Sequence, residues 1–196
     1  MDIELPVDAR QKLIEYLSLL RHWNRVYNLT AIRDRGEMVS KHLLDSLAVL
    51  PYVGHGRALD AGSGAGLPGI PLAIARPDVD FVLIDSSAKK TRFLTQVKIT
   101  LKLGNVVVVN QRVEAYSPMM DDHRIYFDAV IARAFATTRG ILQNTAHLHK
   151  PETRILIMQG RLDPVVDVPG YALQRIHRLN VYGLDAERHL LEIEKT

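Results

Sequence analysis

The sequence predicts a doubly wound α/β protein, with a mostly parallel sheet of seven strands and a helical cap at the N-terminus. Three observations favour this fold. From residue 58 onward, short runs rich in β-branched residues alternate with helical patterns, as in a parallel sheet covered by helices. The first run enters a glycine-dense turn at residues 60–69, and two amphipathic helical segments precede it. We therefore divide the 196-residue chain into a cap, residues 1–55, and a main domain, residues 56–196.

Each element follows from its local pattern, in chain order. Apolar residues recur at helical spacing over residues 8–25 and over residues 37–50, and Pro51 and Gly54 end the second helix. Beyond the glycine turn, the expected strands are residues 79–84, 106–109, 127–132 and 154–158, and the expected helices are residues 86–103 and 140–149. Residues 173–182 and 189–193 are expected strands without a helix between them, which predicts a closing antiparallel hairpin. Residues 163–170 contain two prolines and a glycine, which predicts a surface connection.

Composition excludes several classes of protein. The chain has no cysteine, which excludes disulfides, thiolate metal sites and a cysteine nucleophile. Its start, Met1-Asp2-Ile3-Glu4, is acidic where a signal peptide is basic, and no apolar run approaches the roughly 18 residues of a membrane span. The net charge of +3 permits a polyanionic partner without requiring one. We expect a cytoplasmic, monomeric protein.

The glycine turn predicts a nucleotide-type cofactor. Gly62, Gly64 and Gly66 let the backbone adopt conformations closed to other residues and bring main-chain N–H groups close to a ligand at a helix N-terminus. A dinucleotide fingerprint needs glycine or alanine at position 67, which is Leu67. A GxGxG turn two residues after Asp60 suits a smaller ligand, and S-adenosylmethionine (SAM) is the leading candidate.

An acidic residue ends the next apolar run. Asp85 lies nineteen positions after Gly66, at the carboxyl end of the second expected strand. A carboxylate at this spacing accepts hydrogen bonds from ribose hydroxyls in doubly wound folds. The alternative is that Asp85 only caps the helix that begins near Ser86.

Several short motifs outside the glycine turn are more specific. They are Asn28-Leu29-Thr30-Ala31-Ile32, His42-Leu43-Leu44-Asp45-Ser46, Leu83-Ile84-Asp85-Ser86, Arg112-Val113-Glu114, Ala132-Arg133-Ala134 and Glu187-Arg188-His189-Leu190. With them, the sequence resembles over nearly its whole length the RsmG (GidB) 16S rRNA guanine-N7 methyltransferases, which have the class I fold of SAM-dependent methyltransferases. The chain departs from that family at two places. Gln159-Gly160 stands where a Lys-Gly pair is usual, and Lys150-Pro151-Glu152 where a glycine-containing turn is usual.

The resemblance implies where the cofactor lies. It places Gly62 and Leu67 on the methionine and ribose side, Val113 and Glu114 beside the adenine, and Arg133 near the methyl group. Each position falls at or just after the carboxyl end of an expected strand, where open α/β sheets bind ligands. The alternatives are core packing for Val113, a helix N-terminal carboxylate for Glu114 and a surface charge for Arg133.

The residue types narrow the reaction. Methylation of a pyrimidine C5 needs a cysteine adduct, and methylation of an exocyclic amine usually uses an Asn/Asp-Pro-Pro-aromatic turn where this chain has Arg133-Ala134-Phe135. Guanine N7 carries a lone pair and no proton, so its methylation needs alignment rather than a general base. Arg133, His42 and Asp45 are the candidate catalytic residues, and we expect His42 and Asp45, three apart on one helix face, to form a hydrogen-bonded pair that lines the pocket. Two such side chains are too few for a metal site, and we expect none.

Basic residues give a candidate RNA surface. Lys89, Lys90 and Arg92 begin one expected helix, Arg188 lies in the last motif, and further cations lie in the cap: Arg21, Arg25, Arg33, Arg35 and Lys41. Such clusters are otherwise solvated faces. Phe135, Trp23 and Tyr27 are candidates for stacking on a base, although Trp23 and Tyr27 fit packing of the cap on the main domain better.

The predicted function is methylation of guanine N7 in 16S ribosomal RNA, free or within the small subunit, with SAM as the cofactor. Two alternatives remain open. One is a SAM-dependent methyltransferase for a small molecule or protein. The other is a SAM-binding module without catalysis, which Gln159 in place of the usual lysine makes conceivable.

Overall fold

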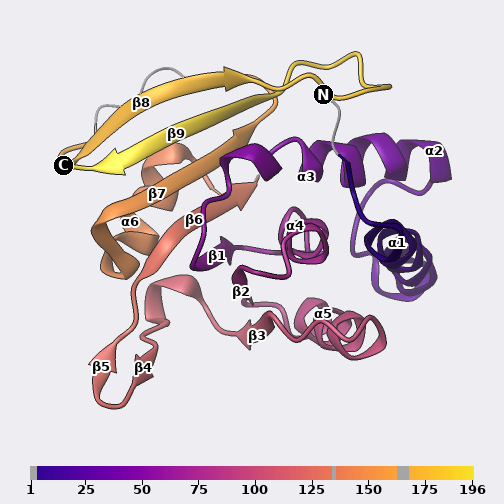
Figure 1. The fold of residues 1–196 in the computed structure, drawn as a ribbon, viewed down its shortest axis with the longest axis horizontal. Helices are drawn as coiled ribbons and strands as arrows, with labels where there is room; N and C mark the ends of the chain where they lie inside the picture. The colour runs from indigo at the N-terminus through magenta and orange to yellow at the C-terminus, as the bar shows by residue number, and fades with distance from the viewer. Residues whose placement is uncertain (1–3, 134–135, 163–167) are drawn as a thin grey trace.

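Seven strands form one twisted sheet at the centre of the molecule (Figure 1). The computed structural model describes residues 4–133, 136–162 and 168–196. The strand order is β3-β2-β1-β6-β7-β9-β8, and only β9 runs antiparallel to its neighbours. The predicted mostly parallel sheet and its closing hairpin are thus confirmed. The strands are β1 (Arg57–Ala61), β2 (Asp80–Asp85), β3 (Val106–Asn110), β6 (Phe127–Arg133), β7 (His149–Gln159), β8 (Tyr171–Arg178) and β9 (His189–Lys195).

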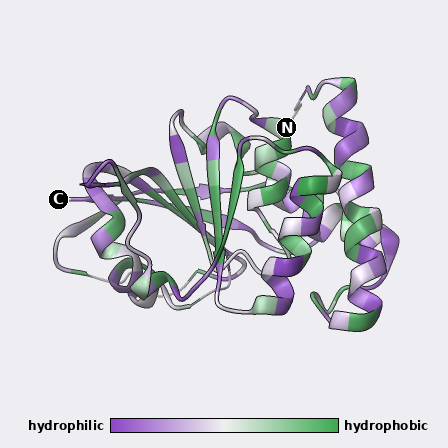
Figure 2. Ribbon diagram, turned by 90° about the horizontal axis from the view of Figure 1, so that it is seen from below, coloured by the Kyte–Doolittle hydropathy of each residue, from purple (hydrophilic) through white to green (hydrophobic). Residues whose placement is uncertain are grey.

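Helices cover both faces of the sheet, because successive strand residues point to opposite sides and both sides are apolar. On β2, Phe81 and Leu83 belong to one core, and Val82 and Ile84 to the other. α1 (Val7–Tyr27), α4 (Gly69–Ala75) and α5 (Ala88–Thr100) pack on the first core, and α6 (Thr138–Thr145) packs on the second. Figure 2 shows the central strands mostly in green, while the helices carry both green and purple residues.

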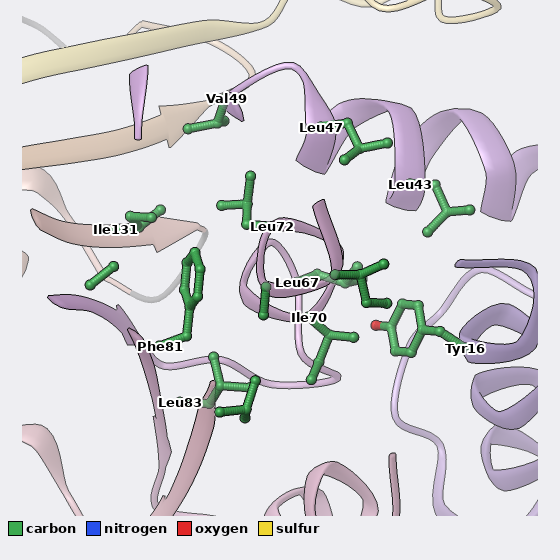
Figure 3. Close-up of a cluster of buried hydrophobic side chains, with 14 of the residues drawn as sticks. Tyr16, Leu43, Leu47, Val49, Leu67, Ile70, Leu72, Phe81, Leu83 and Ile131 are labelled. Carbon is green, nitrogen blue, oxygen red and sulfur yellow. The ribbon is translucent and has the colours of Figure 1, made fainter. Parts of the chain in front are cut away.

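The cap shares its core with the sheet. In Figure 3, Tyr16 of α1 and Leu47 point toward α4, beyond which Phe81 and Ile131 of the sheet lie. Trp23 packs against Phe93 of α5, with ring centroids 5.6 Å apart, and Tyr27 stacks on Trp23 at 5.2 Å. The expected packing of the cap on the main domain is confirmed for Trp23, whereas Tyr27 stacks on Trp23 within α1 and is 41% exposed. Within the described residues, no helix is long and apolar enough to cross a membrane.

The expected helix over residues 37–50 has a different form. It is a chain of short pieces: α2 (Arg35–Met38), a π-helix (Val39–Leu44), α3 (Asp45–Leu47) and a 3₁₀ turn (Leu50–Tyr52). A π-helix inserts into the 3.6-residue pattern without erasing it, so apolar periodicity predicted an ordinary helix here. Such π-turns occur frequently at functional sites. We call residues 35–47 the π segment.

One further expectation is corrected. The helix expected over residues 140–149 ends at Thr145, a 3₁₀ turn (Ala146–Leu148) follows, and His149 already begins β7. Residues 117–125, for which no element was predicted, contain a small hairpin of β4 (Met119–Met120) and β5 (His123–Arg124). A third short element, the 3₁₀ turn Val113–Ala115, follows β3. Part of the expected surface connection at residues 163–170, namely residues 163–167, lies outside the described residues.

Candidate functional site

Two cavities lie at the carboxyl edge of the parallel strands, where doubly wound proteins bind ligands. The glycine-turn cavity, of about 240 Å³, is lined by Gly62, Ile84, Asp85, Ser86, Lys90, Gln111, Arg112, Val113 and Glu114. The arginine cavity, of about 290 Å³, is lined by Ile32, Lys41, His42, Asp45, Arg133, Met158, Gln159, Gly160 and Arg188. They are neighbours, because Ala61 of β1 is paired with Ala132 of β6, which puts Gly62 and Arg133 side by side.

The turn after β1 depends on glycine for two different reasons. Gly64 has φ +59° and open space where a Cβ would lie, with its nearest atom 3.8 Å away, so the backbone conformation alone requires glycine. Gly66 has φ +88°, and a Cβ there would lie 2.6 Å from Ile70 and 2.8 Å from Leu94. Gly66 therefore serves close packing of the turn against α4 and α5.

Asp85 ties the turn to the second strand. Its Oδ2 accepts a hydrogen bond from the Gly64 amide at 3.0 Å, and its Oδ1 accepts one from the Ser87 amide at 2.8 Å. Lys90 Nζ lies 3.5 Å from Oδ2. Asp85 thus lines the cavity and also binds an amide at the start of α5, so the two roles weighed for it are compatible.

The opposite wall of the glycine-turn cavity comes from the 3₁₀ turn after β3. Val113 is buried and belongs to the core, while the Glu114 carboxylate is exposed at the rim. Lys90, which sequence reasoning placed on an RNA surface, lines this cavity beside Asp85. Lys89 and Arg92 remain exposed on α5.

Asp60 and Leu67 are adjacent to the turn but do not line this cavity. Leu67 is a core side chain (Figure 3). Asp60 is fully buried; its Oδ2 accepts a hydrogen bond from the Gly69 amide at 3.0 Å, and its Oδ1 has no partner within the described residues. Burial raises the pKa of Asp60 to about 7, against the effect of the Gly69 hydrogen bond.

One buried carboxylate organises the arginine cavity. Asp45 Oδ2 accepts from Arg133 Nη1 and Asp45 Oδ1 accepts from Arg188 Nε, both at 2.9 Å. Arg133 ends β6, Arg188 immediately precedes β9, and Asp45 lies in the π segment. The structure therefore brings together Asp45 and Arg133, expected as a group, and adds Arg188, which sequence reasoning assigned to the RNA surface.

His42 lies in the same cavity, but the prediction that it is hydrogen-bonded to Asp45 is wrong, because both of its ring nitrogens have other partners. Nδ1 lies 3.1 Å from the Lys41 carbonyl, which can only accept, so Nδ1 carries the proton and Nε2 accepts from the Thr30 hydroxyl at 3.0 Å. Burial lowers the pKa of His42 below its ordinary value of 6.5, and the nearby charge of Arg133 acts in the same direction. His42 is therefore neutral at neutral pH.

Sequence reasoning gave no role to the residues that position His42. Asn24 Oδ1 accepts from the Thr30 amide at 2.8 Å, so a buried residue of α1 holds the loop whose hydroxyl bonds to the imidazole. The Asn28-Leu29-Thr30 motif was the one sign in the sequence of these contacts. Its Thr30 bonds to His42, twelve residues further along the chain. Phe135, a stacking candidate, lies outside the described residues.

The two departures from the family pattern fall at opposite ends of β7. Gln159 lines the arginine cavity, and its Nε2 donates to Thr138 Oγ1 at 2.9 Å. Lys150 lies at the amino end of the strand, where its Nζ pairs with Asp128 at 2.6 Å. Only the departure at Gln159 touches the site.

A third hollow lies on the other side of the π segment. This cap groove, of about 660 Å³, is lined by aliphatic side chains and cations: Ile14, Leu17, Ser18, Arg21, His22, Arg25, Arg35, Gly36, Met38, Val39 and Leu43. None of these described lining residues carries a carboxylate. Within the described part of the chain, Arg21, Arg25 and Arg35 have no side-chain hydrogen bond or ion pair. The described residues also contain no cluster of three or more His, Asp or Glu side chains that could hold a metal ion.

The sheet order, the glycine turn and Asp85 define the class I SAM-dependent methyltransferases, and solved structures share the fold. The mitomycin 7-O-methyltransferase MmcR matches 97% of this chain and 69% of its own, with a TM-score of 0.65 and 13% identity. A mutant of MtNAS in complex with S-adenosylmethionine matches 95% of this chain and 72% of its own, with a TM-score of 0.61 and 16% identity. At such identities the likeness shows the fold alone.

Sequence comparison identifies the family. The model of GidB, rRNA small subunit methyltransferase G, matches residues 9–165. Ribosomal RNA small subunit methyltransferase G of Pseudomonas fluorescens (strain Pf0-1) is 46% identical over 100% of this chain and 91% of its own length. The protein of the same name from Hydrogenovibrio crunogenus is 49% identical over 95% of this chain and 86% of its own. The chain belongs to the GidB family, as the motifs predicted, and SAM is its cofactor.

Proposed function

We propose that this protein transfers a methyl group from SAM to N7 of a guanine in 16S ribosomal RNA. The observation that carries the proposal is the arrangement of Asp45, Arg133 and Arg188 in a cavity beside the glycine turn, in a chain of the GidB family. We further propose that it acts as a cytoplasmic monomer, on ribosomal RNA or the small subunit into which that RNA is assembled.

The residues of the glycine-turn cavity fit SAM. The Asp85 carboxylate is an acceptor for ribose hydroxyls, and the apolar Ile84 and Val113 suit the face of an adenine. Gly62 contributes bare main chain to the same cavity, where a polar amino-acid moiety can approach. When bound, SAM supplies an electrophilic methyl group on a sulfonium centre.

The arginine cavity fits a guanine base. Arginine recognises guanine through O6 and N7, and both Arg133 and Arg188 use only part of their donor sets on Asp45. If N7 points at the methyl group, donors toward O6 are the natural way to fix the base. The single carboxylate between two guanidinium groups leaves the cluster at a net charge of +1, which limits repulsion of the cationic product.

The polar contacts support catalysis by alignment rather than by a general base. Both oxygens of Asp45 accept hydrogen bonds from arginines, and both nitrogens of His42 are engaged by Lys41 and Thr30. Neither group is free to remove a proton, and guanine N7 has none to lose. Asp45 acts in this proposal by positioning the two arginines, and His42 by shaping the neutral wall of the cavity.

The test is a methyl-transfer assay with tritiated SAM. Wild-type protein should label 16S ribosomal RNA or small subunits, and mapping should place the label at guanine N7. Arg133→Ala should reduce the rate by about 100-fold or more, the usual effect of losing a group that fixes the reacting atoms. Arg175→Ala, an exposed change in the middle of β8, is the matched control. Label that enters protein or small molecules and never ribosomal RNA would contradict the proposal.

A further inference from the structure

One side chain of the cap reaches into the turn that precedes α4. Tyr16 of α1 is fully buried, and its hydroxyl donates a 2.7 Å hydrogen bond to the main-chain carbonyl of Ala65. Ala65 lies between Gly64 and Gly66, and it is itself buried. Figure 3 shows the hydroxyl of Tyr16 directed toward α4 and Leu67, away from the body of α1. Forty-nine residues separate the two partners in sequence.

The other hydrogen bonds of the turn come from the sheet, from α4 or from the turn itself. The Ser63 amide donates to the Ile84 carbonyl at 3.0 Å, and the Gly64 amide donates to Asp85 at 3.0 Å. The Gly66 amide donates to the Ser63 carbonyl at 2.7 Å. Among the described residues, Tyr16 provides the one hydrogen bond that joins the cap to this turn.

We propose that Tyr16 is a positioning residue for SAM, acting through the peptide plane between Ala65 and Gly66. The inference rests on the placement of SAM at the glycine turn. A peptide unit is planar, so its carbonyl and its N–H cannot rotate independently. Tyr16 fixes the carbonyl end and Ser63 fixes the N–H end, which leaves this plane no freedom to rotate. The main chain on either side of it, including Gly64, is thereby held ready for the ligand.

The donor is dependable over the whole working range of pH. Burial raises the pKa of the Tyr16 hydroxyl far above its ordinary value, so the group always has its proton. Without this hydroxyl the buried Ala65 carbonyl loses its partner, and a buried carbonyl without a partner favours another orientation of the peptide. The ring of Tyr16 packs beside Phe93. Tyr16→Phe keeps this packing and removes only the hydrogen bond to Ala65.

The decisive variant is Tyr16→Phe, which removes one oxygen atom. We expect the Kd for SAM to rise about tenfold, which corresponds to about 1.4 kcal/mol. The KM for SAM should rise by a similar factor, while kcat at saturating SAM stays within about twofold of wild type, because the Tyr16 bond prepares binding and not the reaction. In the unliganded protein, amide hydrogen exchange at Gly64 and Gly66 should also become faster.

The matched control is Thr153→Val, which removes a buried hydroxyl that donates to the Phe127 carbonyl at 2.6 Å at the opposite edge of the sheet. It should lower the melting temperature without changing the Kd for SAM. The inference is overturned if Tyr16→Phe binds SAM as tightly as wild type, or if both variants weaken SAM equally, since the hydroxyl would then serve only stability. A wild-type protein that binds no SAM would instead contradict the proposed function.

Discussion

Asp45 shows how much of the site depends on single atoms. One carboxylate, nearly inaccessible to solvent, binds two guanidinium groups, one at the end of β6 and the other just before β9. Removing one member of a buried charged group leaves the others without compensation, so the three side chains are expected to act as a unit. The single-residue predictions that follow concern the neighbours of this unit.

Gly64 and Gly66 should respond differently to substitution. Gly64→Val should abolish measurable SAM binding, because a β-branched residue cannot adopt φ +59° without strain and its side chain would occupy the ligand's approach. The melting temperature should also fall because of this strain, although the nearest protein atom lies 3.8 Å from the added Cβ and no clash adds to it. Gly66→Ala should show a larger loss of melting temperature, because its Cβ meets Ile70 and Leu94. Calorimetric titration with SAM and thermal melting measure both. Equal SAM affinity in Gly64→Val and wild type would remove the turn from the cofactor site.

The rate of methyl transfer should be nearly independent of pH in the neutral range. Burial lowers the pKa of His42 below 6.5, so this histidine does not change charge between about pH 6.5 and 8.5. Single-turnover rates at saturating RNA and SAM should vary by no more than about twofold there. The prediction is contradicted if a single titration controls the rate of the wild-type protein and if His42→Ala loses both this titration and the activity. It would make His42 a general base.

At the scale of elements, the π segment separates the arginine cavity from the cap groove. Lys41, His42 and Asp45 line the arginine cavity from one side, while Met38, Val39 and Leu43 line the cap groove from the other. The arginines of the cap groove therefore lie close to the proposed guanine site, on the far side of one helical segment. This arrangement suits an RNA strand that continues past the target base.

The cap groove should contribute phosphate contacts. The triple variant Arg21→Gln, Arg25→Gln, Arg35→Gln should weaken RNA binding and make it less dependent on salt. The slope of log K against log salt should fall by about 0.7–0.9 for each lost contact. Binding of SAM should not change. A triple variant of equal charge elsewhere, Lys102→Gln, Arg124→Gln, Arg175→Gln, is the control. If both variants change the slope equally, the groove has no specific part in RNA binding.

At the scale of the whole molecule, two buried groups give stability opposite dependences on pH. Burial lowers the pKa of His149 from 6.5 to about 4, so the stability that its neutral form contributes is present above pH 6.5 and is lost as pH falls toward 4. Burial raises the pKa of Asp60 from 3.8 to about 7, so its contribution is present at low pH and is lost as pH rises toward 7. Between pH 4 and 6.5 the two effects oppose each other.

Removing either Asp60 or His149 should reveal the pH dependence of stability that the other residue contributes. Relative to wild type, Asp60→Asn should lose stability more steeply as pH falls from about 6.5 to about 4, and His149→Phe should gain stability over the same interval. Each change is bounded by about 1.4 kcal/mol per pH unit, the limit for one proton. Urea denaturation at several pH values measures both slopes. If both variants changed the slope of unfolding free energy against pH in the same direction relative to wild type, the assignment would be contradicted.

The sequence predicted the sheet and the cofactor turn because their signals are local. Continuous apolar runs mark β2 and β6, and the Gly62–Gly66 spacing lies within one turn. The β4–β5 hairpin was missed because its turn, Asp121-Asp122, adopts φ of +49° and +62° without the usual glycine or asparagine. The bond between Arg188 and Asp45 joins residues 143 positions apart, and no local pattern encodes it; the motifs marked both residues but gave Arg188 another role.

The separation of 143 positions between Asp45 and Arg188 affects how the site forms during synthesis of the protein. A ribosome makes the chain from its N-terminus, and domains fold as their segments emerge. Asp45 and Arg133 can meet once the chain has been made as far as β6, but Arg188 arrives only with the final strands. The glycine turn and its neighbouring strands have by then been made, while the second arginine is still missing. A nascent chain therefore passes through a stage in which the residues of the glycine turn have been made but the base-binding cluster is incomplete, and the cluster can form only after residue 188 has emerged.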